Sequence, residues 1–132
     1  MPELTQLVAA LDKHRCINLT TFRKNRQPVV TTVWFVSIRD RLYIWTENNS
    51  GKIKRIRNNS RVELAPATHS GRILGPCFTA QARLLPPEEW GPPEAAFNRR
   101  YGWRKRFFEF IWKVKKAEPL YVEIVPIWTA AS

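Results

Sequence analysis

The 132-residue sequence contains only two cysteines and two histidines. Cys16 and Cys77 lie in separate apolar segments without the spacing of a zinc site or a disulfide framework, so we expect two buried thiols and no metal site. His14 and His69 lie far apart in the sequence, and neither has a serine or a carboxylate at the spacing of a catalytic triad. We therefore expect structural or surface roles for both histidines.

Long apolar runs and a secretion signal are also lacking. No segment approaches the length of a membrane-spanning helix, and Met1 to Leu11 does not combine a basic start with an apolar run. Together with cysteines that we interpret as reduced thiols, this predicts a soluble, cytoplasmic protein. The 11 acidic residues are scattered, so the sequence indicates no general acid or base and leaves any catalytic residue unknown.

Positive charge is in excess. Lysine and arginine total 22, and the formal net charge of +11 favours anionic partners such as nucleic acid, acidic lipid or a phosphorylated cofactor. Much of this charge lies in two blocks, Lys52 to Arg61 and Arg99 to Lys116. Hydrophobic residues make up 44% of the chain, which at this length predicts one folded domain comprising residues 1–132.

The residue patterns predict more strands than helices. Apolar residues at helical spacing predict an opening helix over Glu3 to Lys13, and a second helical region over Glu88 to Lys116 is interrupted at Gly91–Pro93 and at Gly102. The remaining apolar segments, rich in β-branched and aromatic residues, predict strands at Cys16 to Arg23, Pro28 to Ile38, Leu42 to Thr46, Arg61 to Thr68, Ile73 to Leu85 and Leu120 to Ile127.

These elements predict a mainly β protein of the α+β class. About six strands, many in hairpins, favour a closed or nearly closed antiparallel barrel, because closure removes exposed edges. One helix follows the third strand, and a helical lid near the C-terminus is expected to cover the barrel mouth. In the last strand, alternation predicts one wet face, carrying Tyr121, Glu123 and Val125.

The turn after the third strand has the features of a phosphate site. Thr46 ends the strand, Ser50 suits a helix N-cap, Gly51 permits close backbone approach and Lys52 adds a positive charge. The exposed amides of a first helical turn would point at the ligand. An ordinary solvated helix with a serine cap has the same pattern, so this segment alone leaves both interpretations open.

Taken in order, these segments resemble the split β-barrel flavoproteins related to pyridoxamine 5′-phosphate oxidase, and more closely their branch that uses the deazaflavin coenzyme F(420). The resemblance spans nearly the whole chain and is carried by Leu19–Lys24, Pro28–Phe35, Leu42–Thr46, Ser50–Asn59, Arg61–Pro66 and Tyr101–Val114. Three positions depart from the family pattern: Arg26 replaces a turn glycine, Ser60 a proline and Ala67 a cysteine.

The resemblance implies a homodimer with F(420) or FMN in a groove between the subunits. Thr46, Ser50 and Lys52 would hold the phosphate of the cofactor. The strand from Val30 to Val33 would lie along its ring system. Lys54 and Arg55 would extend the anion-binding site toward a longer cofactor tail. Tyr101 and Trp103 of the partner subunit would close the pocket. The implied cofactor-binding residues are Val30, Thr31, Thr32, Val33, Trp45, Thr46, Ser50, Gly51, Lys52, Lys54, Arg55, Tyr101 and Trp103.

The implied function is that of an oxidoreductase that transfers hydride from F(420) or FMN to a small organic substrate. A non-catalytic cofactor-binding protein fits the same residues. The helix from Phe97 to Lys116, with aromatic residues between basic ones, also has the composition of a membrane-surface helix or of a helix packed on the barrel. Nucleic-acid binding is a further alternative, which we disfavour because the aromatic residues fall mainly where we expect burial.

Overall fold

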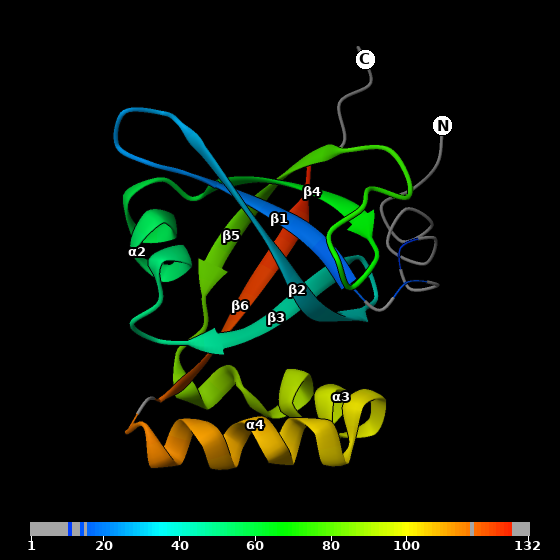
Figure 1. Cartoon of the computed structure of the whole chain (residues 1–132), viewed down its shortest axis with the longest axis vertical. Helices are drawn as coiled ribbons and strands as arrows, with labels where there is room; N and C mark the ends of the chain where they lie inside the picture. The colour runs from blue at the N-terminus through cyan, green and yellow to red at the C-terminus, as the bar shows by residue number, and fades with distance from the viewer. Residues whose placement is uncertain (1–10, 12–13, 15, 117, 128–132) are drawn as a thin grey trace.

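The computed structural model describes residues 11, 14, 16–116 and 118–127. Six antiparallel strands form a closed barrel in the order β1-β2-β3-β6-β5-β4 (Figure 1). The strands are β1 (Cys16–Phe22), β2 (Pro28–Ile38), β3 (Arg41–Glu47), β4 (Arg61–Ala67), β5 (Phe78–Leu84) and β6 (Pro119–Pro126). The helical elements are α2 (Gly51–Asn58), the short 3₁₀ helix η1 (Pro87–Glu89), α3 (Gly91–Tyr101) and α4 (Trp103–Val114). The predicted mainly β class and six-stranded barrel are confirmed.

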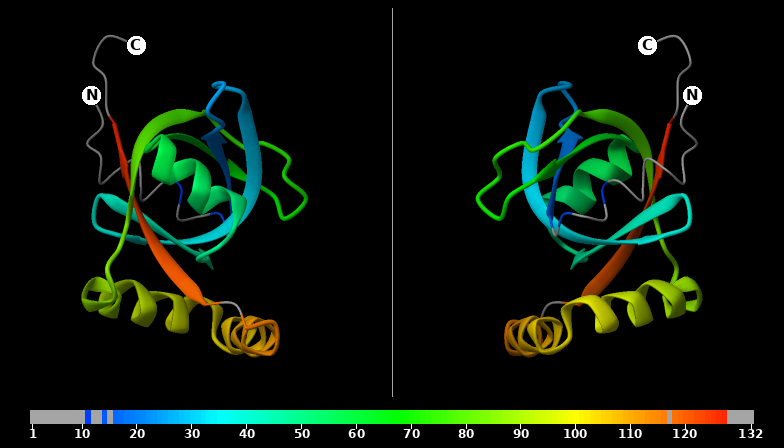
Figure 2. Two further views of the ribbon diagram at one scale, coloured as in Figure 1. Left: turned by 90° about the vertical axis from the view of Figure 1, so that its left-hand side faces the viewer. Right: turned by 90° about the vertical axis from the view of Figure 1, so that its right-hand side faces the viewer.

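Apolar side chains from alternating positions fill the barrel interior. Ile17 and Leu19 of β1 meet residues such as Ile44 and Val122 there, all of them fully buried. Helix α2 contributes Ile53 to the same cluster, so α2 closes one mouth of the barrel. The side views show α2 lying against that opening (Figure 2). Its amphipathic pattern thus buries one stripe in the core and leaves the basic residues outside.

A second apolar cluster lies outside the barrel wall. Outward residues of β2, β3 and β6 pack against Phe97 and Tyr101 of α3 and against Trp112 of α4. Helices α3 and α4 therefore form a layer below the barrel in Figure 1. We predicted a lid over the barrel mouth, which is wrong in position. The reason is that α2 already fills that mouth, while Val36, Tyr43 and Trp45 leave an apolar patch on the wall that needs cover.

Several predicted boundaries need correction. Strand β5 begins at Phe78 rather than Ile73, because Gly75 and Pro76 interrupt the apolar run, and Ile73 forms only an isolated bridge to Ala67. Cys77, which precedes the strand, is exposed, whereas Cys16 is buried as predicted. Gly91–Pro93 does not break a helix but begins one, since proline is tolerated in a first turn.

The break at Gly102 is confirmed, because this glycine has a φ of 53° and separates α3 from α4. The predicted opening helix, Glu3 to Lys13, lies outside the described residues except for Leu11, which is helical and buried.

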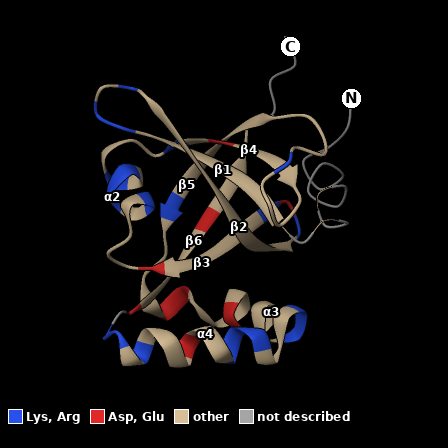
Figure 3. Cartoon of the chain, viewed as in Figure 1, with Lys and Arg blue, Asp and Glu red and all other residues tan. Residues whose placement is uncertain are grey.

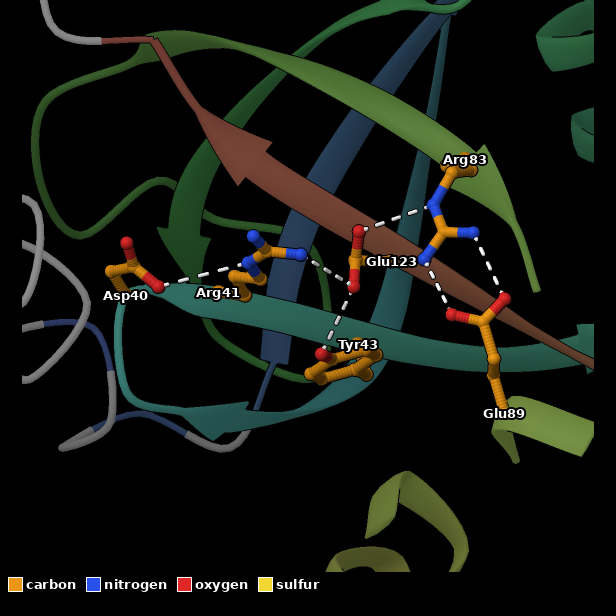
Figure 4. Close-up of polar contacts among 6 residues, drawn as sticks. All are labelled: Asp40, Arg41, Tyr43, Arg83, Glu89 and Glu123. Carbon is orange, nitrogen blue, oxygen red and sulfur yellow. Dashed lines mark hydrogen bonds and ion pairs between the residues drawn. The ribbon is translucent and has the colours of Figure 1, made fainter. Parts of the chain in front are cut away.

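A charged network fastens the wall formed by β3, β5 and β6. Oxygens of the buried Glu123 accept hydrogen bonds from Tyr43 at 3.1 Å, from Arg83 Nε at 3.3 Å and from Arg41, 3.0 Å away (Figure 4). Arg83 also binds both carboxylate oxygens of Glu89 in η1. The face of β6 carrying Glu123 is therefore buried, and our prediction of a wet face is wrong there, because the helical layer and two long arginine side chains cover it.

Candidate functional site

A groove of about 240 Å³ lies where β2, β3, the start of α2 and the inner face of α4 meet. Its walls combine hydroxyl groups, a lysine and indole rings. The lining residues are Thr32, Val33, Trp34, Trp45, Thr46, Lys52, Phe108 and Trp112. The structure thus brings together part of the strand that we predicted would lie along the cofactor ring, Thr32 and Val33, with Thr46 and Lys52, two of the three residues that we predicted would hold a phosphate.

Aromatic side chains form the apolar side of the groove. The rings of Trp45 and Trp112 have centroids 4.2 Å apart, and Phe108 meets Trp34 edge to face at 5.2 Å. Beneath them, the buried Lys105 places its ammonium 4.9 Å from the Trp45 ring and pairs with Glu109 at 3.2 Å. Indole faces of this kind are suited to a planar ligand, because aromatic rings stack favourably at such distances.

The polar end of the groove is the first turn of α2. Ser50 is its N-cap, and the serine Oγ accepts a hydrogen bond from the amide of Ile53 at 3.4 Å, as the sequence predicted. Within the described part of the chain, the amides of Gly51 and Lys52 have no acceptor. Amides at a helix N-terminus favour an anion, and here two of them remain available for one.

Lys52 is the cation of this polar end. Burial lowers the pKa of its ammonium group, and the charge of Arg55 lowers it further, while Glu47 opposes the change. No described carboxylate forms an ion pair with Lys52. Because a partly desolvated cation gains most from an opposite charge, an anionic ligand at this position would be stabilised.

Thr31 and Thr32 of β2 differ in the direction of their side chains and in their hydrogen bonds. Thr32 faces outward into the groove and donates its hydroxyl proton to Asn18 Oδ1 at 2.7 Å, which leaves its oxygen to accept a hydrogen bond. The Oγ1 atom of Thr31 is buried and has no partner among the described residues. A buried hydroxyl without a partner is costly. Because neighbouring side chains of a strand point to opposite faces, the Thr31 hydroxyl lies on the other face of β2 from Thr32, and Thr31 is not among the residues that line the groove.

Three other predicted residues are not among those that line the groove. Arg55 points to β1, where its Nε donates to Thr21 Oγ1 at 2.6 Å, while Lys54 is exposed on the outside of α2. Val30 is exposed further along β2. Of the two α2 cations that we predicted would hold a longer cofactor tail, Arg55 therefore lies near the polar end of the groove, where its guanidinium adjoins Gly51 and its charge acts on Lys52, whereas Lys54 does not.

Tyr101 and Trp103 occupy contrasting positions. Tyr101 is buried within its own chain, because its hydroxyl donates to the carbonyl of Phe35 at 2.7 Å and its ring stacks on Trp34 at 4.6 Å. Trp103 is 73% exposed. The first is thus engaged in attaching α3 to β2, and the second is accessible to another molecule.

Sequence reasoning missed three residues of the groove. Trp34 shares the outward face of β2 with Thr32, so strand alternation was a signal that could have found it. Phe108 and Trp112 are four residues apart on α4 and so lie on one helix face. Their contribution depends on the side of the barrel to which α4 docks, which the helical pattern does not specify.

The sequence matches the family model for pyridoxamine 5′-phosphate oxidase over residues 4–117, so the chain belongs to that family. No curated protein matches the sequence significantly. Among the described helices, none has the length and apolar composition needed to cross a membrane.

Solved structures share the fold at low sequence identity. The conserved hypothetical protein Rv2991 of Mycobacterium tuberculosis has a TM-score of 0.69 at 19% identity, with 97% of this chain and 82% of that chain covered. The heme storage protein HutZ of Vibrio cholerae has a TM-score of 0.69 at 14% identity, with 97% and 93% covered. An FAD-binding protein of Mesorhizobium loti has a TM-score of 0.61 at 16% identity, with 96% and 90% covered.

Proposed function

We propose that the groove binds FMN or the deazaflavin F(420) and that the protein is an oxidoreductase acting on a small organic substrate. The observation that carries the proposal is the position of Lys52, a partly buried cation without an ion-pair partner among the described residues, in a groove with one aromatic side. Membership of the pyridoxamine 5′-phosphate oxidase family supports it.

The residues present fit such a cofactor. Lys52 would bind its phosphate together with the free amides of Gly51 and Lys52 and the hydroxyl of Ser50. The strand from Thr32 to Trp34 would lie along the ring, with the Thr32 oxygen available to accept a hydrogen bond from it. When bound, a flavin or deazaflavin supplies the hydride-transfer chemistry, and the protein orients the ring and excludes water.

A heme-binding role is not favoured, although one structural neighbour is a heme storage protein. The described residues that line the groove include no histidine, cysteine, methionine or tyrosine, which are the usual axial ligands of heme iron. His69 lies instead beside Cys16, with its Nδ1 atom 3.4 Å from the cysteine sulfur. A non-catalytic cofactor-binding protein remains the second candidate, because the groove residues include no general acid or base.

Replacement of Lys52 by alanine is expected to weaken cofactor binding by about 10-fold to 100-fold, because loss of a charge-assisted contact costs about 1.5–3 kcal/mol. Isothermal titration with FMN and with F(420) separately measures this effect and identifies which cofactor is bound. Lys24→Ala is the matched control, since Lys24 is an exposed lysine in the turn between β1 and β2. Absence of binding by both cofactors, or equal losses in the two variants, would refute the proposed site.

The oxidoreductase activity needs a separate measurement. The reduced cofactor is bound to the wild-type protein and mixed with small organic acceptors such as quinones and nitroaromatic compounds. Absorbance of the oxidised cofactor should then reappear faster than in a solution of free reduced cofactor. Tight binding without any acceleration would favour the non-catalytic alternative.

We further propose that a second copy of the chain completes the groove. The outward stripe of α4, formed by Trp103, Phe107, Phe110 and Val114, is exposed, while Phe108 and Trp112 on the inner side of the same helix line the groove. A copy docked on this stripe would therefore border the open side of the groove. Our expectation that the aromatic residues are mainly buried holds for Tyr101 but is wrong for Trp103, because α4 uses its opposite face to contact the barrel.

The double variant Phe107→Asp, Phe110→Asp is expected to be monomeric at micromolar concentration, because burial of two carboxylates in an apolar interface carries a large desolvation free energy. Light scattering coupled to size exclusion should give twice the chain mass for the wild type and the chain mass for this variant. Leu74→Asp, which alters an exposed apolar residue away from α4, serves as the control. A wild-type monomer that sediments with anionic phospholipid vesicles would instead assign the stripe to a membrane surface.

A further inference from the structure

A second cavity, of about 500 Å³, lies at the opposite end of α2 from the groove. It is lined by Phe22, Arg26, Asn59, Arg61 and Glu63, none of which lines the groove. Figure 3 shows that basic residues gather on the β1–β2 connection and on α2, the two segments that border this region. The volume lies within the range of small-molecule binding sites.

The sheet register explains how these residues come together. Thr20 of β1 is paired with Glu63 of β4, so continuation of the same antiparallel register sets Phe22 opposite Arg61. Side chains two residues apart on a strand share one face, which places Phe22, Arg61 and Glu63 together on the outer barrel wall. Asn59, the C-cap of α2, accepts a hydrogen bond from the Arg61 amide at 3.1 Å and forms the adjoining edge.

Two guanidinium groups at this cavity have no carboxylate partner among the described residues. In the described part of the chain, the side chains of Arg26 and Arg61 form no ion pair or hydrogen bond, whereas Arg41 and Arg83 are both paired with Glu123. An arginine offers up to five donors in a planar fork that suits phosphate oxygens. The C-terminal end of α2 carries partial negative charge, which Arg55 and Arg57 in its last turn offset.

Arg26 also has an unfavourable backbone conformation. Its φ of 70° is in the left-handed region, which glycine adopts without steric cost and in which a residue with a Cβ is strained. Glycine would serve this turn better, yet the residue present is an arginine whose side chain lines the cavity.

We propose that this cavity binds a phosphorylated nucleoside. Arg26 and Arg61 would contact the phosphates bidentately, and the ring of Phe22 would pack against the base. Glu63 would accept hydrogen bonds from ribose hydroxyls, and the Asn59 side-chain amide would donate one. This site is separate from the groove, so its occupancy does not require the proposed redox function.

The matched variants Arg26→Gly and Arg39→Gly test the proposal. Both arginines have a positive φ, 70° and 59°, so each change removes one charge and relieves one strained residue, but only Arg26 lines the cavity. Titration calorimetry with ADP, GDP, CDP and UDP should show binding of at least one of them to the wild-type protein. Arg26→Gly should weaken that binding at least 10-fold, whereas Arg39→Gly should change it less than 2-fold.

Two further titrations test whether the base and ribose contribute to nucleotide affinity and whether the nucleotide binds in the groove instead of the cavity. Pyrophosphate should bind at least 10-fold more weakly than the preferred nucleotide, because it lacks the base and ribose, and Lys52→Ala should leave nucleotide affinity within 2-fold. No binding of any of the four nucleotides at millimolar concentration would overturn the proposal. So would equal losses in the two glycine variants, equal affinity for pyrophosphate, or a large loss in Lys52→Ala.

Discussion

Replacement of Phe97 by alanine is expected to lower the free energy of unfolding by about 3–5 kcal/mol, the range for removal of a buried aromatic side chain. Phe97 of α3 is fully buried against the barrel wall. Its ring centroid lies 5.3 Å from that of Tyr101, 5.9 Å from Tyr121 and 6.2 Å from Trp45. The cavity left by its removal would adjoin Trp45, which also lines the groove, so cofactor affinity should fall together with stability.

Urea unfolding followed by circular dichroism measures the first effect, and cofactor titration measures the second. Leu74→Ala, at an exposed apolar position, should change stability by no more than about 0.5 kcal/mol. If Phe97→Ala lowered the free energy of unfolding by less than about 1 kcal/mol, the helical layer would not be packed on the barrel wall as described. A large loss of stability with unchanged cofactor affinity would show that Trp45 does not depend on this layer for its position.

Replacement of Glu123 by glutamine is expected to cost about 1.5–3 kcal/mol at neutral pH, the range for hydrogen bonds to charged groups. Tyr43, Arg41 and Arg83 all donate to this carboxylate from two other strands, so its charge links β3, β5 and β6. Both arginines are about half exposed and can be solvated when the carboxylate is lost, which keeps the cost below that of a fully buried pair.

The pH dependence gives this prediction a second readout. Burial alone would raise the pKa of Glu123, but hydrogen bonds from Arg41, Arg83 and Tyr43 outweigh it and hold the pKa below its usual value. Because the folded-state pKa is depressed, the stabilisation is present above the unfolded-state pKa and is lost as the pH falls through the folded-state value. The stability difference between wild type and Glu123→Gln should therefore shrink as the solution is acidified.

Unfolding in urea at pH values from 7 down to 3 measures that difference. Glu88→Gln is the control, since Glu88 is exposed in η1 and outside the network. A difference between wild type and Glu123→Gln that stayed constant over this range would show that the charge of Glu123 does not contribute.

The barrel was predictable from sequence because strand alternation and turn composition act locally. Pro28 to Ile38 was identified with its observed bounds, and the Ser50 cap was identified from residue type. The start of β5 was missed because Gly75 and Pro76 weaken a run that otherwise looks continuous. The burial of Glu123 was missed because an alternating polar residue looks solvated until the elements covering it are known.

The groove was predictable only in part. Thr46 and Lys52 follow from the strand, turn and helix signals, because a few neighbouring residues position them. Phe108 and Trp112 come from a helix more than 50 residues later in the chain, and their place depends on where that helix docks. The inner face of α4 is unusual in that it buries Lys105, with Trp45 and Glu109 as its neighbours, so hydrophobic periodicity alone selects the wrong side of this helix.

The position of β6 between β3 and β5 has a kinetic consequence. Its partner β3 ends at Glu47, more than 70 residues earlier. Pairing of β6 with β3 on one side and with β5 on the other closes the barrel. On the ribosome, the first three strands emerge with an unpaired edge at β3, and the cylinder closes only when Pro119–Pro126 has been synthesised. Closure over so long a loop is slow. The nascent chain therefore exposes a strand edge for most of its synthesis, the period when it is most prone to aggregation.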